Sequence, residues 1–216
     1  MILFHLKRPE KPITRGVLAV ACVWASSLLV GACSPAKKST IEPTTQLKPQ
    51  ASKDAGGLFR SQAQALGAAA GQTLRSAPNF NLPDQAGRSH FLQSFKGKWI
   101  LVHFWAAWCP PCRSEISEWI ELGAHLKDKT IQFIAVSMDP DWEEVEKVVP
   151  SKSVPPQIIS LIDPSVKTPE TYGTYQFPET YLINPEQKIV TKWVGPQNWG
   201  DPKIKEFFVK LTETTR

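Results

Sequence analysis

The sequence predicts an α/β domain over residues 76–216, with a mixed central sheet flanked by helices and an N-terminal strand extension. An aromatic and β-branched run at 98–105 has the composition of a buried strand. It leads into an amphipathic helix at about 111–127, where apolar residues recur at three- and four-residue steps. Near the end of the chain, apolar runs at 179–183 and 188–194 flank a short turn and form a hairpin. Strands that alternate with helices and end in a hairpin give a mixed sheet.

The other elements of this domain follow from shorter patterns. Asp141 has a side chain suited to capping a helix, and Pro202 suits the first turn of the last helix because no N–H needs an acceptor there. The expected strands and helices, in order, lie at 77–82, 89–92, 98–105, 111–127, 131–138, 141–149, 158–162, 166–172, 179–183, 188–194 and from 201 onward. A domain of this length buries about two-thirds of its unfolded surface, which is enough for one core.

Residues 1–32 have the features of a bacterial lipoprotein signal peptide. Basic residues precede a mostly apolar run at 16–30, and Val30-Gly31-Ala32-Cys33 resembles a lipobox. The run is shorter than the roughly 20 residues of a membrane-spanning helix, and its flanks fit an export signal. We therefore expect lipid on Cys33 and a domain that faces the extracytoplasmic side of the cell envelope. An uncleaved membrane anchor is the alternative, and it gives the same location.

Residues 33–75 have the composition of a flexible tether. They carry few large apolar side chains, so they cannot bury enough surface to fold on their own. The chain has a formal net charge of +5, but residues 76–216 hold 15 basic and 17 acidic residues, a net charge of −2. The basic character belongs to the signal and the tether, which could lie on anionic lipid or be solvated linker. The domain has no basic stripe, so we expect no nucleic-acid partner.

The segment Trp105–Cys112 reads Trp-Ala-Ala-Trp-Cys-Pro-Pro-Cys and places two cysteines where a strand ends and a helix begins. Unpaired N–H groups at a helix start carry a partial positive charge and favour a thiolate. Cysteines in this arrangement have pKa values lowered to roughly 3.5–7.5. We expect Cys109 to be the nucleophile and Cys112, one turn further and more shielded, to resolve a mixed disulfide. Pro110 and Pro111 suit the first helical turn and stiffen the loop.

Three other roles of the cysteine pair stay open: a structural disulfide, half of a zinc site, or two buried thiols. Zinc needs about four ligands, and none of the four histidines stands at a spacing that would complete a site. We therefore expect neither a metal nor another cofactor. Cys22 would leave with the signal peptide and Cys33 would carry lipid, so Cys109 and Cys112 would be the only thiols of the mature chain. In an oxidising compartment, a reduced pair needs a supply of electrons.

Three sequence blocks, in this order, resemble the TlpA/ResA-like members of the thioredoxin superfamily. The first is Ala77–Leu82 with Phe95–Lys98, the second is His103–Glu115, and the third is Phe177–Asn184. The resemblance covers essentially all of residues 76–216 and implies the thioredoxin fold. It also implies a membrane-anchored thiol–disulfide oxidoreductase that reduces exported proteins such as apocytochrome c. A membrane thiol transporter of the DsbD/CcdA kind would supply its electrons.

The resemblance also implies roles for single residues. Pro178 corresponds to the cis-proline that lies beside the cysteines and holds an extended substrate chain, with Phe177 before it. An ordinary trans-proline at the start of a strand is the alternative. Glu115 corresponds to a glutamate that moves protons and tunes the thiols, and it shares a helix side with Cys112 because the two lie at i and i+3. A solvated surface glutamate is the alternative.

His103 departs from the family pattern, since thioredoxins carry a buried aspartate at this position and TlpA-like chains usually an asparagine. Burial disfavours a charged imidazole, so a neutral His103 could accept a proton from Cys112. The alternative is a structural residue that is hydrogen-bonded under the sheet. Of the two tryptophans of the motif, we expect Trp105 in the core and Trp108 in an apolar surface that docks partner proteins.

We expect an enzyme that exchanges disulfides with exported proteins, and three other functions stay open. A thiol peroxidase of the redoxin type would need a threonine where Ala106 stands. A copper carrier would need a wider cysteine spacing and a downstream histidine, but no histidine follows His125. A structural lipoprotein would carry an inert disulfide. The motif does not fix the direction of electron flow, because thioredoxin-fold couples span about −270 to −120 mV, or roughly 7 kcal/mol for two electrons.

Overall fold

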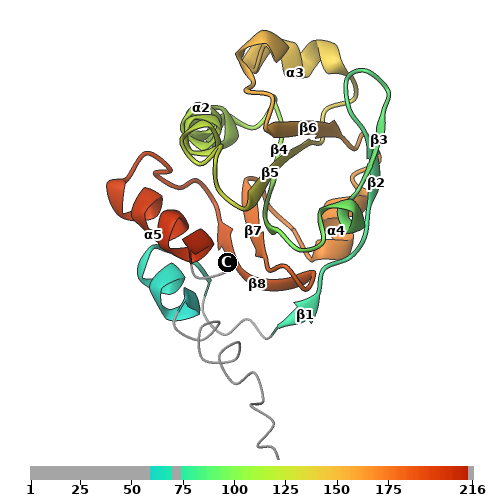
Figure 1. Cartoon of the computed structure of the whole chain (residues 1–216). Helices are drawn as coiled ribbons and strands as arrows, with labels where there is room; N and C mark the ends of the chain where they lie inside the picture. The colour runs from blue at the N-terminus through green and yellow to red at the C-terminus, as the bar shows by residue number, and fades with distance from the viewer. Residues whose placement is uncertain (1–58, 70–73, 214–216) are drawn as a thin grey trace, which may run out of the picture. The chain divides into compact units, whose positions relative to one another are not determined.

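The computed structural model describes residues 59–69 and 74–213. Its main sheet has six strands in the order β1-β8-β7-β4-β5-β6 (Figure 1). The strands are β1 (Arg75–Ser76), β4 (Trp99–Trp105), β5 (Ile131–Ser137), β6 (Ile158–Ile162), β7 (Glu179–Ile183) and β8 (Lys188–Val194). β4, β5 and β6 run parallel, whereas β7 is antiparallel to β4 and to β8. The sheet is therefore mixed, as the sequence predicts.

Helices cover both faces of this sheet. The helices are α2 (Pro110–His125), α3 (Trp142–Val148), α4 (Lys167–Tyr172) and α5 (Pro202–Glu213), with the 3-10 helices η1 (Leu92–Phe95) and η2 (Ser151–Ser153). α2 and α5 lie on one face, and α4 lies on the other (Figure 1). A separate hairpin pairs β2 (Asn81–Pro83) with β3 (Ser89–Phe91). Together these elements form the expected thioredoxin fold.

β4 is the strand that leads into the cysteine motif. All seven of its residues are buried, because β4 lies between β5 and β7 and is covered on both faces. A strand of this kind reads as a continuous apolar run, and in β4 only His103 interrupts it. The strand ends at Trp105, so the loop that follows emerges at the end of the sheet where the carboxyl ends of the parallel strands β4 and β5 lie.

Most of the expected elements are present, with ends that differ by a few residues. β6, β7 and β8 coincide with the expected ranges, and Asp141 caps α3 as expected. The strand expected at 77–82 is the main difference. Only its end pairs as β2, while β1 lies earlier and pairs with β8. Pro78 contributes to the gap, because proline has no N–H to donate to a strand ladder.

Residues 59–69 pack on the domain, although their composition predicts that they belong to the tether. The segment begins with helical turns, and the Phe59 ring contacts Phe207 of α5 edge-on, with 6.4 Å between ring centroids. Trp193 Nε1 donates a hydrogen bond to Leu66 O at 3.1 Å. A flexible tether would therefore have to end before Phe59. Composition does not reveal this packing, because the partner surfaces on β8 and α5 lie far along the chain.

The expected signal peptide at 1–32, the lipidation site Cys33 and the first part of the tether lie outside the described residues. Within the described part of the chain, no helix is long and apolar enough to cross a membrane. The lipid anchor and the processing of the N-terminus therefore stay predictions.

Candidate active site

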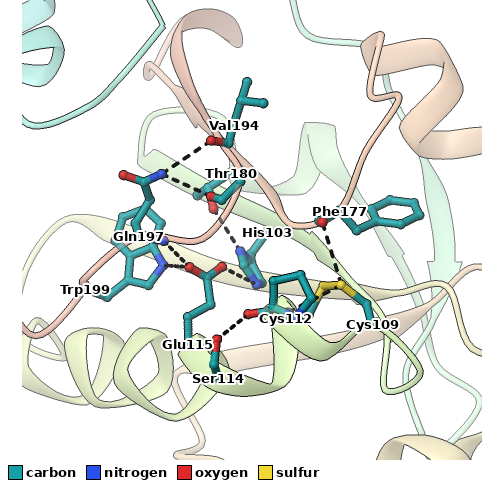
Figure 2. Close-up of polar contacts among 12 residues, drawn as sticks. His103, Cys109, Cys112, Ser114, Glu115, Phe177, Thr180, Val194, Gln197 and Trp199 are labelled. Atoms are coloured by element: carbon teal, nitrogen blue, oxygen red, sulfur yellow. Dashed lines mark hydrogen bonds and ion pairs between the residues drawn. A yellow bond between two sulfur atoms is a disulfide. The ribbon is translucent and has the colours of Figure 1, made fainter.

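The two cysteines of the motif lie at the start of α2 and form a disulfide (Figure 2). Cys109 is the N-cap of the helix, and its sulfur lies 3.4 Å from the backbone nitrogen of Cys112. Pro110 and Pro111 occupy the first two helical positions, where no N–H needs a partner. Cys112 is completely buried, and 5% of Cys109 is exposed. When the disulfide is open, the positive end of this 16-residue helix favours a thiolate at Cys109.

The segment before β7 lies against the disulfide. The Phe177–Pro178 peptide bond is cis, as expected, and the carbonyl oxygen of Phe177 lies 3.7 Å from Cys109 Sγ. The Phe177 ring meets the Trp108 ring edge-on, with 6.0 Å between centroids. Trp108 is 60% exposed, whereas Trp105 is buried in the core. The disulfide therefore lies beside an apolar surface formed by Trp108 and Phe177, which we call the aromatic rim.

Glu115 lies one turn after Cys112 on α2, and only 3% of it is exposed. The alternative of a solvated surface glutamate is therefore wrong. Its Oε2 atom accepts hydrogen bonds from the backbone N–H of Gln197 and, at 3.2 Å, from Trp199 Nε1 (Figure 2). Burial raises the pKa of this carboxyl to about 7, although both hydrogen bonds act to lower it. Near neutral pH, Glu115 can therefore take up or release a proton.

His103 lies in the middle of β4, directly opposite Thr180 of β7. Its Nδ1 atom is 2.8 Å from Thr180 Oγ1, and its ring stacks on Trp119 of α2 with 5.1 Å between centroids. Complete burial lowers the pKa of His103 to about 3, so the imidazole is neutral at physiological pH. The other ring nitrogen, Nε2, lies 3.6 Å from Glu115 Oε1. The hydrogen bond expected for a structural histidine is present, and the ring also faces Glu115.

Two supporting parts of the site are not among the residues expected from the sequence. The first is the loop between β8 and α5, which holds Glu115 and lies far from it in sequence. The second is Asp139, whose Oδ2 atom accepts hydrogen bonds from Ala107 N at 2.8 Å and from Ser137 Oγ at 2.5 Å. These bonds fix the loop that leads to Cys109. The signal in the sequence is a carboxylate just after a buried strand, because the ends of the parallel neighbours β4 and β5 lie at one edge of the sheet.

The polar residues around the disulfide do not form a metal site. Within residues 59–69 and 74–213, no cluster of three His, Cys, Asp or Glu side chains could hold an ion. Cys109 and Cys112 are bonded to each other, and His103 faces Thr180 and Glu115. The arrangement is suited to thiol–disulfide exchange coupled to proton transfer.

Comparisons with known proteins agree with this geometry. The family model described as AhpC/TSA matches residues 74–192. The thiol-disulfide oxidoreductase ResA of Bacillus thuringiensis subsp. konkukian is 30% identical over 138 residues, which cover 64% of this chain and 78% of the relative. Among solved structures, the thioredoxin domain of a thiol-disulfide oxidoreductase from Bacteroides vulgatus has a TM-score of 0.55 at 28% identity, covering 66% of this chain and 99% of that one. A thiol:disulfide interchange protein from Bacteroides sp. has a TM-score of 0.55 at 30% identity, covering 66% of this chain and 91% of that one.

The stretch matched by the family model contains the disulfide, Glu115 and the cis-proline. The chain therefore belongs to the AhpC/TSA family of the thioredoxin superfamily, and within it to the TlpA/ResA-like thiol–disulfide oxidoreductases.

Proposed function

We propose that this chain is an extracytoplasmic reductase of disulfides in exported proteins such as apocytochrome c. The observation that carries the proposal is the cysteine pair at the N-terminus of α2, beside a cis-proline and the aromatic rim. An exposed side chain such as Trp108 would add no stability to a disulfide with a purely structural role. The buried Glu115 adds a group that exchanges protons near neutral pH.

The reaction passes two electrons from the cysteine pair to a partner disulfide. The Cys109 thiolate attacks one partner sulfur, so that a bond between Cys109 and the partner forms and the other partner sulfur leaves as a thiolate. Cys112 then loses its proton and attacks Cys109 Sγ. The bond between Cys109 and Cys112 forms, and the second partner sulfur leaves. The partner is reduced, and the pair ends as the disulfide seen in the structure.

The aromatic rim and the cis-proline segment would bind the partner chain. An extended chain would lie along Phe177 and Pro178 and form main-chain hydrogen bonds there, close to Cys109. Trp108 and Phe177 would contact apolar side chains of the partner, and the rigid turn of Pro110 and Pro111 would keep Cys109 in place.

The cysteine pair would be reduced again by a membrane thiol transporter of the DsbD/CcdA kind. Lipid on Cys33 would hold the chain at the membrane of a bacterial cell envelope, and the residues between Cys33 and Phe59 would tether the domain. The basic charge of the N-terminal part and the lipobox-like ending of its apolar run support this arrangement.

Reduction of insulin by dithiothreitol tests the proposed activity. The wild-type protein should accelerate the reaction, whereas Cys109→Ser should leave only the uncatalysed rate, because the attacking thiolate is gone. Cys33→Ser is the matched control: it removes the lipid attachment site but should keep the full rate. Equal rates with and without the wild-type protein would leave the inert structural disulfide as the better explanation.

Peroxide consumption separates this function from that of a thiol peroxidase. The match to the AhpC/TSA family model leaves a thiol peroxidase as the alternative function. However, Ala106, three residues before Cys109, has no hydroxyl group. We therefore expect no peroxide turnover above the level of a free thiol. Turnover that depends on Cys109 and exceeds insulin reduction would favour the peroxidase.

A further inference from the structure

In His103 and in Glu115, one polar side-chain atom has no hydrogen-bond partner, and these two atoms face each other. Within the described residues, His103 Nε2 and Glu115 Oε1 are buried and form no hydrogen bond, and they lie 3.6 Å apart (Figure 2). The other polar atoms of the pair are occupied, His103 Nδ1 by Thr180 and Glu115 Oε2 by Gln197 and Trp199. Because Oε2 already accepts two N–H groups, a proton on Glu115 sits on Oε1, where it faces His103.

Two arrangements of protons satisfy every atom of this group once Nε2 and Oε1 close to hydrogen-bond distance. When Glu115 is ionised, the Thr180 hydroxyl donates to His103 Nδ1, and Nε2–H donates to Oε1. When Glu115 is protonated, Oε1–H donates to Nε2, and Nδ1–H donates to the Thr180 oxygen. The imidazole is neutral in both arrangements. A hydroxyl suits Nδ1 because it can either donate or accept, whereas a backbone carbonyl could only accept.

We propose that His103 changes tautomer as Glu115 takes up and releases a proton. By the role that the family resemblance implies for Glu115, this proton is the one that Cys112 loses when it resolves a mixed disulfide. In that step the Cys112 S–H bond breaks, the O–H bond on Glu115 Oε1 forms, and the new thiolate attacks Cys109. Reduction of the disulfide returns the proton to Cys112. His103 is thus a positioning residue that keeps the buried carboxyl hydrogen-bonded in both states. The origin of the proton rests on the proposed function, but the tautomer change does not.

The titratable groups around the pair agree with this transfer. α2 contributes Cys112 and Glu118, and the negative charge of Glu118 raises the pKa of Glu115. β4 contributes His103, whose pKa burial lowers to about 3. The other groups that face the pair are uncharged: the side chains of Thr180, Trp119 and Trp199, and the backbone N–H of Gln197. Glu115, with a pKa of about 7, therefore titrates while the imidazole stays neutral.

Nitrogen NMR of the full-length, oxidised protein with isotope-labelled histidine tests the tautomer change directly. As the pH is raised through the pKa of Glu115, about 7, the protonated and unprotonated ring nitrogens of His103 should exchange roles, with no imidazolium formed. The exposed His125 of α2 is the internal reference for a ring in contact with solvent. In Glu115→Gln, which cannot titrate, His103 should keep one tautomer at every pH.

A second variant measures the effect of His103 on the carboxyl. His103→Phe keeps an aromatic ring against Trp119 but removes the partner of Oε1, which destabilises the carboxylate more than the neutral acid. The midpoint of the Glu115 titration, followed by carbon NMR, should rise by about one pH unit. The same substitution at the exposed His125 should leave that midpoint in place.

The outcomes separate this inference from the proposed function. A single His103 tautomer throughout the titration of Glu115, an imidazolium at its midpoint, or an unmoved midpoint in His103→Phe overturns the inference, even where insulin reduction is normal. Absence of insulin reduction with an intact tautomer change overturns the proposed function and the assignment of the proton to Cys112.

Discussion

Replacing Glu115 by glutamine should change how the stability of the protein depends on pH. The pKa of this carboxyl is about 7 in the folded chain against an ordinary value of 4.5. Between these values the folded state binds more protons than the unfolded state, so the free energy of unfolding falls as the pH rises. At about 1.4 kcal/mol for each pKa unit, the loss reaches about 3 kcal/mol above pH 7 and is absent below 4.5. Glutamine keeps an acceptor for Gln197 and Trp199 but never ionises.

Urea denaturation of the oxidised protein at about pH 5 and about pH 8 measures this difference. Between these two conditions, Glu115→Gln should gain roughly 2 to 3 kcal/mol in the free energy of unfolding relative to wild type. Comparing variant with wild type removes the opposing contribution of His103, which destabilises the fold as the pH falls below 6.5. Glu121→Gln makes the same change at an exposed position of α2 and should gain nothing. Parallel pH profiles of wild type and Glu115→Gln would show that the Glu115 carboxyl has no raised pKa in the folded protein.

Three further substitutions follow from the same structure. Burial lowers the pKa of His103 from 6.5 to about 3, so His103 costs the wild-type protein stability between neutral pH and about pH 5, whereas the phenylalanine of His103→Phe does not titrate. Over this change of pH, the free energy of unfolding of His103→Phe, measured by urea denaturation, should rise by about 2 kcal/mol relative to wild type. An unchanged difference would contradict the lowered pKa of His103. Tyr181→Phe removes a hydroxyl that donates to the buried Glu179 at 2.7 Å, and it should cost about 1–3 kcal/mol in the same assay, with an unchanged midpoint as the contrary result. Gly67 has a φ of +88° and faces Gln197, so Gly67→Ala should cost about 1–2 kcal/mol, and a neutral effect would show that residues 59–69 are not docked.

The central strands could be predicted because their signals are local. β6, β7 and β8 are short apolar runs between turn residues, and their observed ranges equal the expected ones. The docking of the helical turns at 59–65 on the domain could not be predicted in this way, because Phe207, which contacts Phe59, lies far along the chain on α5. Local composition thus indicates whether a segment can form a helix or a strand, but not which surface of the fold the segment packs against.

The cysteine pair and the cis-proline could be predicted from sequence motifs, whereas the burial of Glu115 and its raised pKa could not. The i to i+3 spacing places Glu115 on the side of Cys112, but its burial depends on the loop that carries Gln197 and Trp199. That loop has no pattern that points to α2. For His103, the sequence left two roles open, and the cross-strand register with Thr180 identifies the hydrogen-bond partner.

Trapping of the mixed disulfide tests directly whether Cys109 attacks partner disulfides and Cys112 resolves the intermediate. The full-length Cys112→Ala variant is produced in cells, and its covalent adducts are analysed by non-reducing electrophoresis and mass spectrometry. We expect adducts that join Cys109 to a cysteine of an exported protein, disappear with reductant and are absent from Cys109→Ala. If adducts are missing from Cys112→Ala, or equally abundant in Cys109→Ala, Cys109 is not the attacking residue of a resolvable mixed disulfide.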